Sequence, residues 1–107
     1  MIAYESPQLD ALGDPTRRAI LARLQQAESA VGDLAREFPI SRPAVSQHLR
    51  VLKQAGLVTD RAIGTRRLYS VDPAGLRALR EYFDQFWTTA LDAFKARAEA
   101  RPHRRPR

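Results

Sequence analysis

The chain has 107 residues, of which 44% are hydrophobic and 28% charged, with no cysteine and a formal net charge of +6 at pH 7. These values exclude a disordered chain, two ordinary domains, a disulfide framework and any thiolate metal site. Because it has neither a secretory signal pattern nor a run of about 18 apolar residues, the protein is expected to be cytoplasmic.

Helical spacing dominates the first forty residues. The segment SPQLDAL, residues 6–12, predicts a short helix with Leu9 and Leu12 on one side. Asp14 and Pro15 then suit the N-cap and first position of a second helix. The apolar residues Leu12, Ala19, Ile20, Leu24 and Ala27 recur at helical spacing and are expected to form its inward face. A third helix is expected over about residues 31–38, with Leu34, Ala35 and Phe38 inward, before Pro39 ends it.

The next stretch, SRPAVSQHLRVLKQAG, predicts a fourth helix, with Ser41 as N-cap and Gly56 at the C-terminal stop. Two short helices joined by about three residues are what a helix-turn-helix requires. At 100° per residue the apolar centre of this helix holds Val45, Leu49 and Leu52, flanked by Ala44, Val51 and Ala55. That face is expected to pack on the core.

The opposite arc of the fourth helix is polar and contains no acid. Short polar side chains near its start can reach base edges in the DNA major groove, and the longer cations further along can reach phosphates. A solvated helix face that merely lacks acids is the alternative interpretation. The arc consists of Arg42, Pro43, Ser46, Gln47, Arg50, Lys53 and Gln54.

A hairpin is expected next, with strands over about residues 58–62 and 66–71 around Gly64 and Thr65. Arg66 and Arg67 lie beside the turn and Arg61 lies across the ladder, where a protruding tip can reach a neighbouring minor groove or the DNA backbone. The alternative is that these arginines only protect an exposed edge strand. The expected fold is thus mostly α with a two-stranded β-wing.

Asp72 and Pro73 open a long last helix, expected to run to about residue 99. At 1.5 Å per residue it spans about 40 Å, more than a compact body with a radius of gyration of about 13 Å can cover. We therefore expect pairing with a second copy, with packing inside one monomer or an apolar ligand pocket as alternatives. The expected interface residues are Leu9, Leu12, Leu79, Tyr82, Phe83, Phe86, Trp87, Leu91 and Phe94.

The positive charge is confined to two segments. Residues 41–71 hold six Arg or Lys against Asp60 alone, and residues 95–107 hold six against Glu99 alone, so each segment carries +5. Such localised basic charge is typical of nucleic-acid binders. We expect one DNA-binding and dimerisation domain over residues 1–99 and a basic flexible tail over residues 100–107.

Catalysis is not expected. The sequence has no G-x-S-x-G elbow, Gly-rich phosphate loop or metal triad. Ser46 and His48 are two residues apart on different faces of one helix, so they cannot act as nucleophile and base. His48 falls within the apolar arc and is interpreted as a partly buried structural residue, with a DNA contact as the alternative.

Three segments together resemble the ArsR/SmtB family of bacterial winged-helix repressors. They are LGDPTRRAILARL, VGDLAREFPISRPAVSQHLRVLKQAGLV and GTRRLYSVDP. The resemblance implies a homodimeric, DNA-binding repressor, in which Ser41, Arg42, Ser46, Gln47 and Arg50 match the recognition helix. It also implies that Arg66 and Arg67 belong to the wing.

The chain departs from the metal-sensing members of that family. Ala30 and Gly32 stand where arsenic sensors have a Cys-x-Cys pair, and the last helix has carboxylates but no histidine. His103 lies alone in the tail, so neither a metal site nor another cofactor is expected. The chain is most similar to the cysteine-free, non-metal-sensing branch.

The resulting expectation is a homodimeric repressor that binds an inverted-repeat operator in double-stranded DNA and is released by an unknown non-thiol signal. One alternative is a non-specific architectural DNA-binding protein. Another is a repressor controlled by an apolar ligand or protein partner at the dimer interface.

Overall fold

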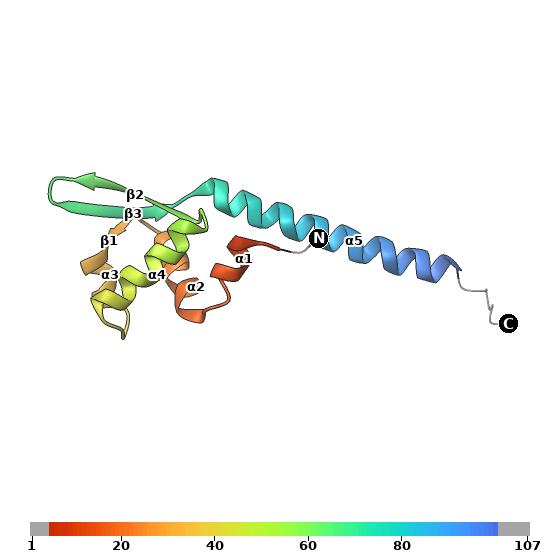
Figure 1. Ribbon diagram of the computed structural model, residues 1–107, viewed down its shortest axis with the longest axis horizontal. Coiled ribbons are helices and arrows are strands. Elements are labelled where there is room, and N and C mark those ends of the chain that lie inside the picture. Colours follow the sequence, from red (N-terminus) through yellow and green to blue (C-terminus); the bar gives the residue numbers. More distant parts are fainter. Residues whose placement is uncertain (1–4, 101–107) are drawn as a thin grey trace.

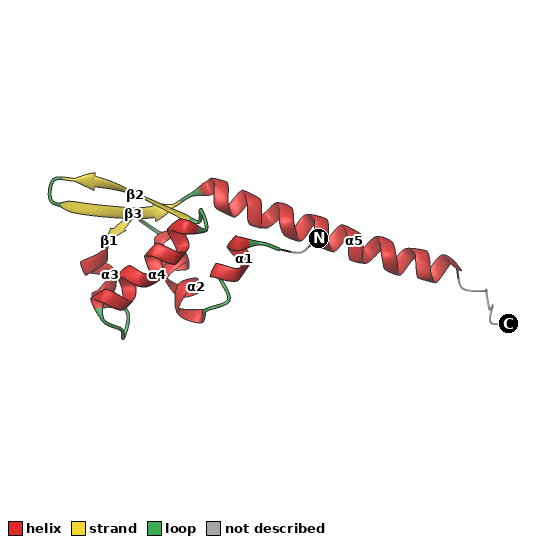
Figure 2. Cartoon of the chain, in the orientation of Figure 1, coloured by secondary structure: helices red, strands yellow, loops and turns green. Residues whose placement is uncertain are grey.

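The computed structural model describes residues 5–100. Five helices and three short strands follow one another along the chain (Figures 1 and 2). In chain order they are α1 (Pro7–Ala11), α2 (Pro15–Leu24), β1 (Ser29–Ala30), α3 (Val31–Glu37), α4 (Arg42–Gln54), β2 (Val58–Ile63), β3 (Arg66–Val71) and α5 (Pro73–Ala100).

The starts of α2 and α4 are capped as the sequence predicts. The Asp14 carboxylate accepts backbone hydrogen bonds from Thr16 N at 2.7 Å and Arg17 N at 3.1 Å. Ser41 Oγ accepts one from Ala44 N at 3.2 Å. Each cap precedes a proline in the first turn, where the missing N–H costs nothing because it has no partner within the helix.

The core lies where α2, α3 and α4 meet the start of β2. Its fully buried side chains include the three predicted from α4. They are Ile20, Leu34, Val45, Leu49, Leu52, Leu57 and Val58. The inward face predicted for α2 is partly wrong, because Ala19 and Ala27 are exposed whereas Leu21 is buried. Helix α2 ends at Leu24, so Ala27 lies beyond its last turn.

The sheet has three antiparallel strands in the order β1-β3-β2. The predicted hairpin is confirmed, with Val58 opposite Val71 and Ile63 opposite Arg66. The sequence did not predict β1, whose Ser29 and Ala30 pair with Tyr69 and Leu68. Two residues are too few to show the alternation that marks a strand.

Helix α5 projects far beyond the rest of the molecule, as Figure 1 shows. The principal extents are 72 × 26 × 25 Å, and every side chain from residue 83 to residue 100 is exposed. Ala100, the first residue of the predicted tail, is the last residue of α5 and the last residue that the structure describes. The rest of that tail, including His103, lies outside the described residues.

A close backbone approach anchors the start of α5. Gly75 is buried against the turn that follows α4, where Gly56 adopts a positive φ of 77°. A Cβ atom added to Gly75 would overlap the Gly56 carbonyl oxygen and lie 2.9 Å from Leu57 Cα. Asp72 N also donates to Leu57 O at 2.9 Å. The direction of α5 is therefore set by backbone contacts at its first turn.

Gly75→Ala is expected to lower the free energy of unfolding by about 1–3 kcal/mol, because the added methyl group meets backbone atoms that cannot swing aside. Urea denaturation followed by circular dichroism measures this change. Gly32→Ala is the matched control, because its Cβ would lie 3.5 Å from the Arg42 side chain, an ordinary contact. Wild-type stability of Gly75→Ala would contradict the close approach.

Candidate nucleic-acid interface

Helix α4 presents its polar arc to solvent because its apolar side is buried. Val45, Leu49 and Leu52 have no exposed surface. All of the predicted DNA-binding residues of this helix and its N-cap are exposed, namely Ser41, Arg42, Pro43, Ser46, Gln47, Arg50 and Lys53. Within residues 5–100, the guanidinium groups of Arg42 and Arg50 take part in no ion pair. These two cations are therefore available to an anionic partner.

The two faces of the hairpin carry different arginines. In the β2–β3 register, Arg61 lies opposite Leu68 and Ile63 lies opposite Arg66, so Arg61 and Arg66 share one face. Arg67 lies opposite Ala62 on the other face. The wing arginines predicted to bind DNA therefore lie on both faces of the hairpin and do not form one patch.

Asp60 links the wing to the end of α4. Its carboxylate accepts from Lys53 Nζ at 2.8 Å and from Arg67 Nη1 at 2.9 Å, and its side chain is only 6% exposed. The hydrogen bond from Lys53, followed by that from Arg67, lowers the pKa of Asp60 below its ordinary value of 3.8 against the opposing effect of burial. Two of the predicted DNA-binding cations are thus already engaged within the chain.

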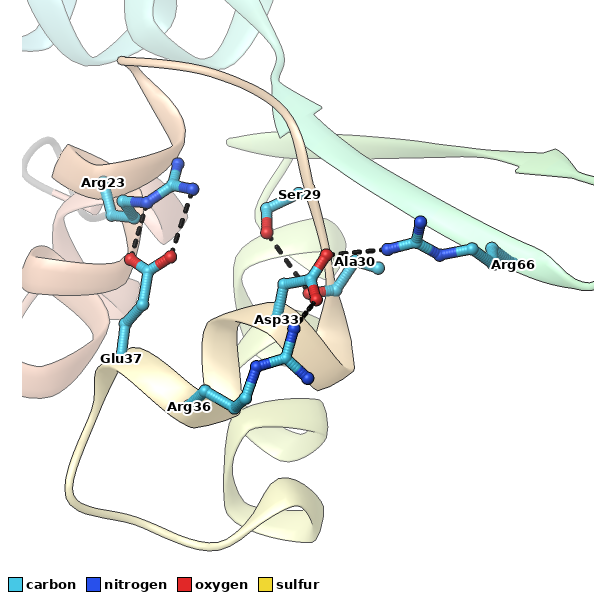
Figure 3. A network of polar contacts seen from close by, with 7 residues as sticks. All are labelled: Arg23, Ser29, Ala30, Asp33, Arg36, Glu37 and Arg66. Atoms are coloured by element: carbon cyan, nitrogen blue, oxygen red, sulfur yellow. Dashed lines mark hydrogen bonds and ion pairs between the residues drawn. The ribbon is translucent and has the colours of Figure 1, made fainter.

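Arg66 and Arg61 also have partners, and these come from the segment that precedes the wing in sequence. Arg66 Nη2 lies 2.7 Å from Asp33 Oδ2, and Arg36 contacts the other oxygen of the same carboxylate (Figure 3). Arg61 Nη2 lies 2.8 Å from Glu28 Oε2. The sequence did not predict these acidic partners, because they lie 33 residues from the arginines they contact.

An open cleft of ≈ 470 Å³ lies where the first turn of α4, the start of α3 and the wing turn come together. Gly32 forms part of its wall beside the Arg42 guanidinium. Three arginines and one acid line the cleft, together with small residues: Ala30, Val31, Gly32, Asp33, Arg42, Thr65, Arg66 and Arg67. Its size and charge suit a stretch of sugar-phosphate backbone.

His48 is half-buried and contacts the scaffold. Its Nδ1 lies 3.5 Å from Arg17 Nη1, and Arg17 Nε donates to Ala11 O at 2.6 Å. The pKa of Asp14 is lowered, first by the backbone hydrogen bond from Arg17 and also by the charge of His48. The interpretation of His48 as a structural residue agrees with this arrangement.

The residues predicted for the dimer interface are half-buried near the body of the molecule and exposed along the projecting part of α5. Leu12 packs against the core and Leu79 is half-buried, whereas Leu9 is at the edge of the body with 36% of its surface exposed. Tyr82 stacks on Phe86 and meets Phe83 edge to face, with ring centroids 6.4 and 5.5 Å apart. The large apolar side chains left exposed on α5 are Phe83, Phe86, Trp87, Leu91 and Phe94.

Neither a metal cluster nor a spanning helix is found between residues 5 and 100. No three His, Cys, Asp or Glu side chains in that range are grouped so that they could hold a metal ion. No helix in the same range is long and apolar enough to cross a membrane.

Comparison with known proteins gives the family. Residues 14–60, which include the helix-turn-helix, match the model of the bacterial regulatory protein, arsR family. The HTH-type transcriptional regulator Rv2034 of Mycobacterium tuberculosis is 58% identical over 96 residues, which cover 88% of this chain and 90% of that protein. The chain belongs to the ArsR family. As a member it is a transcriptional regulator with a winged helix-turn-helix DNA-binding domain, and not an enzyme.

Other ArsR-type relatives extend the similarity. The transcriptional repressor SdpR of Bacillus subtilis is 42% identical over 63% of this chain and 74% of its own length. A crystal structure described as a possible transcriptional regulator for arsenical resistance matches with a TM-score of 0.73 and 49% identity, over 86% of this chain and 96% of that one. The solution structure of the homodimeric winged helix-turn-helix domain of Mb0332 from Mycobacterium bovis matches with a TM-score of 0.61 and 30% identity, over 94% and 85% of the two chains.

Asp60→Asn is expected to lower the free energy of unfolding by about 1–3 kcal/mol at pH 7, because two nearby cations lose a poorly exposed partner. The pKa of Asp60 is lower in the folded protein than its ordinary value of 3.8. The contribution of the Asp60 carboxylate to stability is therefore fully present above pH 3.8 and is lost as the pH falls through the pKa of the folded protein. Urea titrations at pH 7 and below pH 3.8 measure the free energies of unfolding of the wild type and the variant. The difference between them is expected to become smaller at the lower pH.

Asp84→Asn is the control for Asp60→Asn, because Asp84 forms an exposed ion pair with Arg80 at 3.8 Å. Its effect on unfolding is expected to stay within about 0.5 kcal/mol. Equal effects of the two substitutions at pH 7 would show that Asp60 does not join the wing to α4.

Proposed function

We propose that this ArsR-family regulator is a homodimeric repressor that binds an inverted-repeat operator in double-stranded DNA. The observation that carries the proposal is the outward, acid-free arc of α4, whose Arg42 and Arg50 take part in no ion pair within residues 5–100. Ser46 and Gln47 in the first turns of the helix are suited to base edges, and the arginines to phosphates or guanine. Repression agrees with the description of the relative SdpR as a transcriptional repressor.

The exposed apolar side of α5 supports a dimer. Phe83, Trp87 and Phe94 leave 44%, 63% and 62% of their surfaces exposed, which is unusual for aromatic side chains of a monomer. A second copy related by a twofold axis would cover them and present two α4 helices to successive half-sites. The homodimeric Mb0332 domain has the same fold, which supports this arrangement.

The releasing signal acts without thiol chemistry in this chain, because the sequence has no cysteine. An apolar ligand or a protein partner at the α5 interface remains a second route to release. A non-specific architectural role is separated from repression by the ratio of operator to random-DNA affinity. Repression requires a ratio of at least about 10³ for a sequence selected from random DNA.

Arg50→Ala is expected to weaken binding to the selected operator by about tenfold or more, because each subunit loses an exposed cation of the recognition helix. Fluorescence anisotropy at moderate salt measures the affinity. Arg77→Ala removes the same charge from α5 and should change binding much less. Unchanged affinity of Arg50→Ala would contradict the assignment of α4 to the major groove.

Trp87→Glu is expected to give monomers that lose operator binding, since it places a charge in the apolar face of α5. Light scattering measures the mass in solution. Gln85→Glu introduces the same charge on the opposite side of the helix and should leave the dimer intact. A stable Trp87→Glu dimer would require a different interface.

A further inference from the structure

The exposed ion pair between Asp33 and Arg66 lies at the rim of the arginine-lined cleft. Asp33 belongs to the first turn of α3, and Arg66 follows the wing turn at the start of β3. Figure 3 shows the Asp33 carboxylate between Arg36 of its own helix and Arg66 of the wing. In this arrangement Asp33 engages Nη2 of Arg66, which is one of the donors that a DNA phosphate could use, and its charge offsets that of Arg66.

The ion pairs around the wing differ in how easily they can be exchanged. Asp60 is 6% exposed and is held by both Lys53 and Arg67, so its exchange would leave a poorly solvated group without partners. Asp33 is 38% exposed and Arg66 is 58% exposed, so water can solvate both groups when they separate. Exposed pairs of this kind contribute little to stability. Asp33 can therefore release Arg66 without disturbing the core.

A phosphate can bind to the cleft through Arg42 while Asp33 still contacts Arg66. Arg42, in the first turn of α4, lines the cleft beside Gly32 and has no ion pair within residues 5–100. A phosphate bound by Arg42 would bring negative charge close to Arg66 and to Asp33. Its attraction to Arg66 and its repulsion of Asp33 both favour replacement of the carboxylate by the phosphate.

We propose that Asp33 competes with a DNA backbone phosphate for Arg66, so that this acid lowers the affinity of the regulator for DNA. This inference rests on the proposed DNA-binding function and identifies Asp33 as a residue that limits the affinity for DNA. In the free protein the Asp33 carboxylate offsets the charge of Arg66, and on DNA binding a phosphate replaces that carboxylate as the partner of Arg66. Such a residue weakens attachment to any DNA sequence while leaving base contacts by α4 unchanged.

The test is the affinity of Asp33→Asn for the selected operator and for random DNA. We expect both to rise by a similar factor, roughly twofold to thirtyfold per dimer, because the exposed pair between Asp33 and Arg66 is removed in each of the two subunits. Glu37→Gln is the matched control, since it makes the same charge change on the same helix and breaks the exposed pair with Arg23 at 2.7 Å. This control should change neither affinity by more than about twofold.

Arg66→Gln distinguishes competition of Asp33 for Arg66 from direct repulsion between Asp33 and the DNA phosphates. If Asp33 acts by holding Arg66, the gain from Asp33→Asn disappears in the Arg66→Gln background. A gain that persists there, or an equal gain from Glu37→Gln, overturns the competition. Thermal melts of all variants ensure that compared proteins are folded, and Asp33→Glu, which keeps the charge, should restore weaker binding.

The outcome for the wild type distinguishes the two proposals. If the wild-type protein binds no DNA sequence preferentially, the proposed operator binding fails. If it binds its selected operator and Asp33→Asn binds no more tightly, only the competition by Asp33 fails.

Discussion

Val45, Leu49 and Leu52 are completely buried, and this burial sets the rotation of α4 about its own axis. Full burial of each such side chain contributes about 1.5–3 kcal/mol, so a rotation that exposed all three would cost a large part of the stability of a small domain. The positions of Ser46, Gln47 and Arg50 follow from this constraint, because they lie on the opposite side of the same helix. The orientation of the polar arc of α4 therefore depends on the core beneath it.

Electrostatic contacts place the wing relative to that helix, with buried and exposed acids in different roles. Asp60 joins Lys53 at the end of α4 to Arg67 on β3, whereas Glu28 and Asp33 face arginines at the solvent-exposed surface. Asp60 is already included in the net charge of +5 counted along residues 41–71, and two acids outside that segment, Glu28 and Asp33, pair with two more of its cations. Arg42 and Arg50 remain as the unbalanced cations among the described residues of that segment.

Much of the fold could be predicted because its signals are local. Asp14 and Ser41 mark helix starts through hydrogen bonds to residues two or three positions away, and the alternation around Gly64 marks the hairpin. The contact of Asp33 with Arg66 could not be predicted, since it depends on how α3 and the wing pack. Strand β1 was missed for a similar reason, as its two residues become a strand only by pairing with β3.

The exposure of α5 beyond residue 82 also has a kinetic consequence. Helical segments without tertiary packing are marginally stable in water and exchange between helix and coil within about a microsecond. In a free protomer the backbone amides of this segment would therefore exchange with solvent almost as rapidly as those of an unfolded chain. In the proposed dimer, association would slow that exchange by many-fold, because a second copy would cover the apolar side of α5.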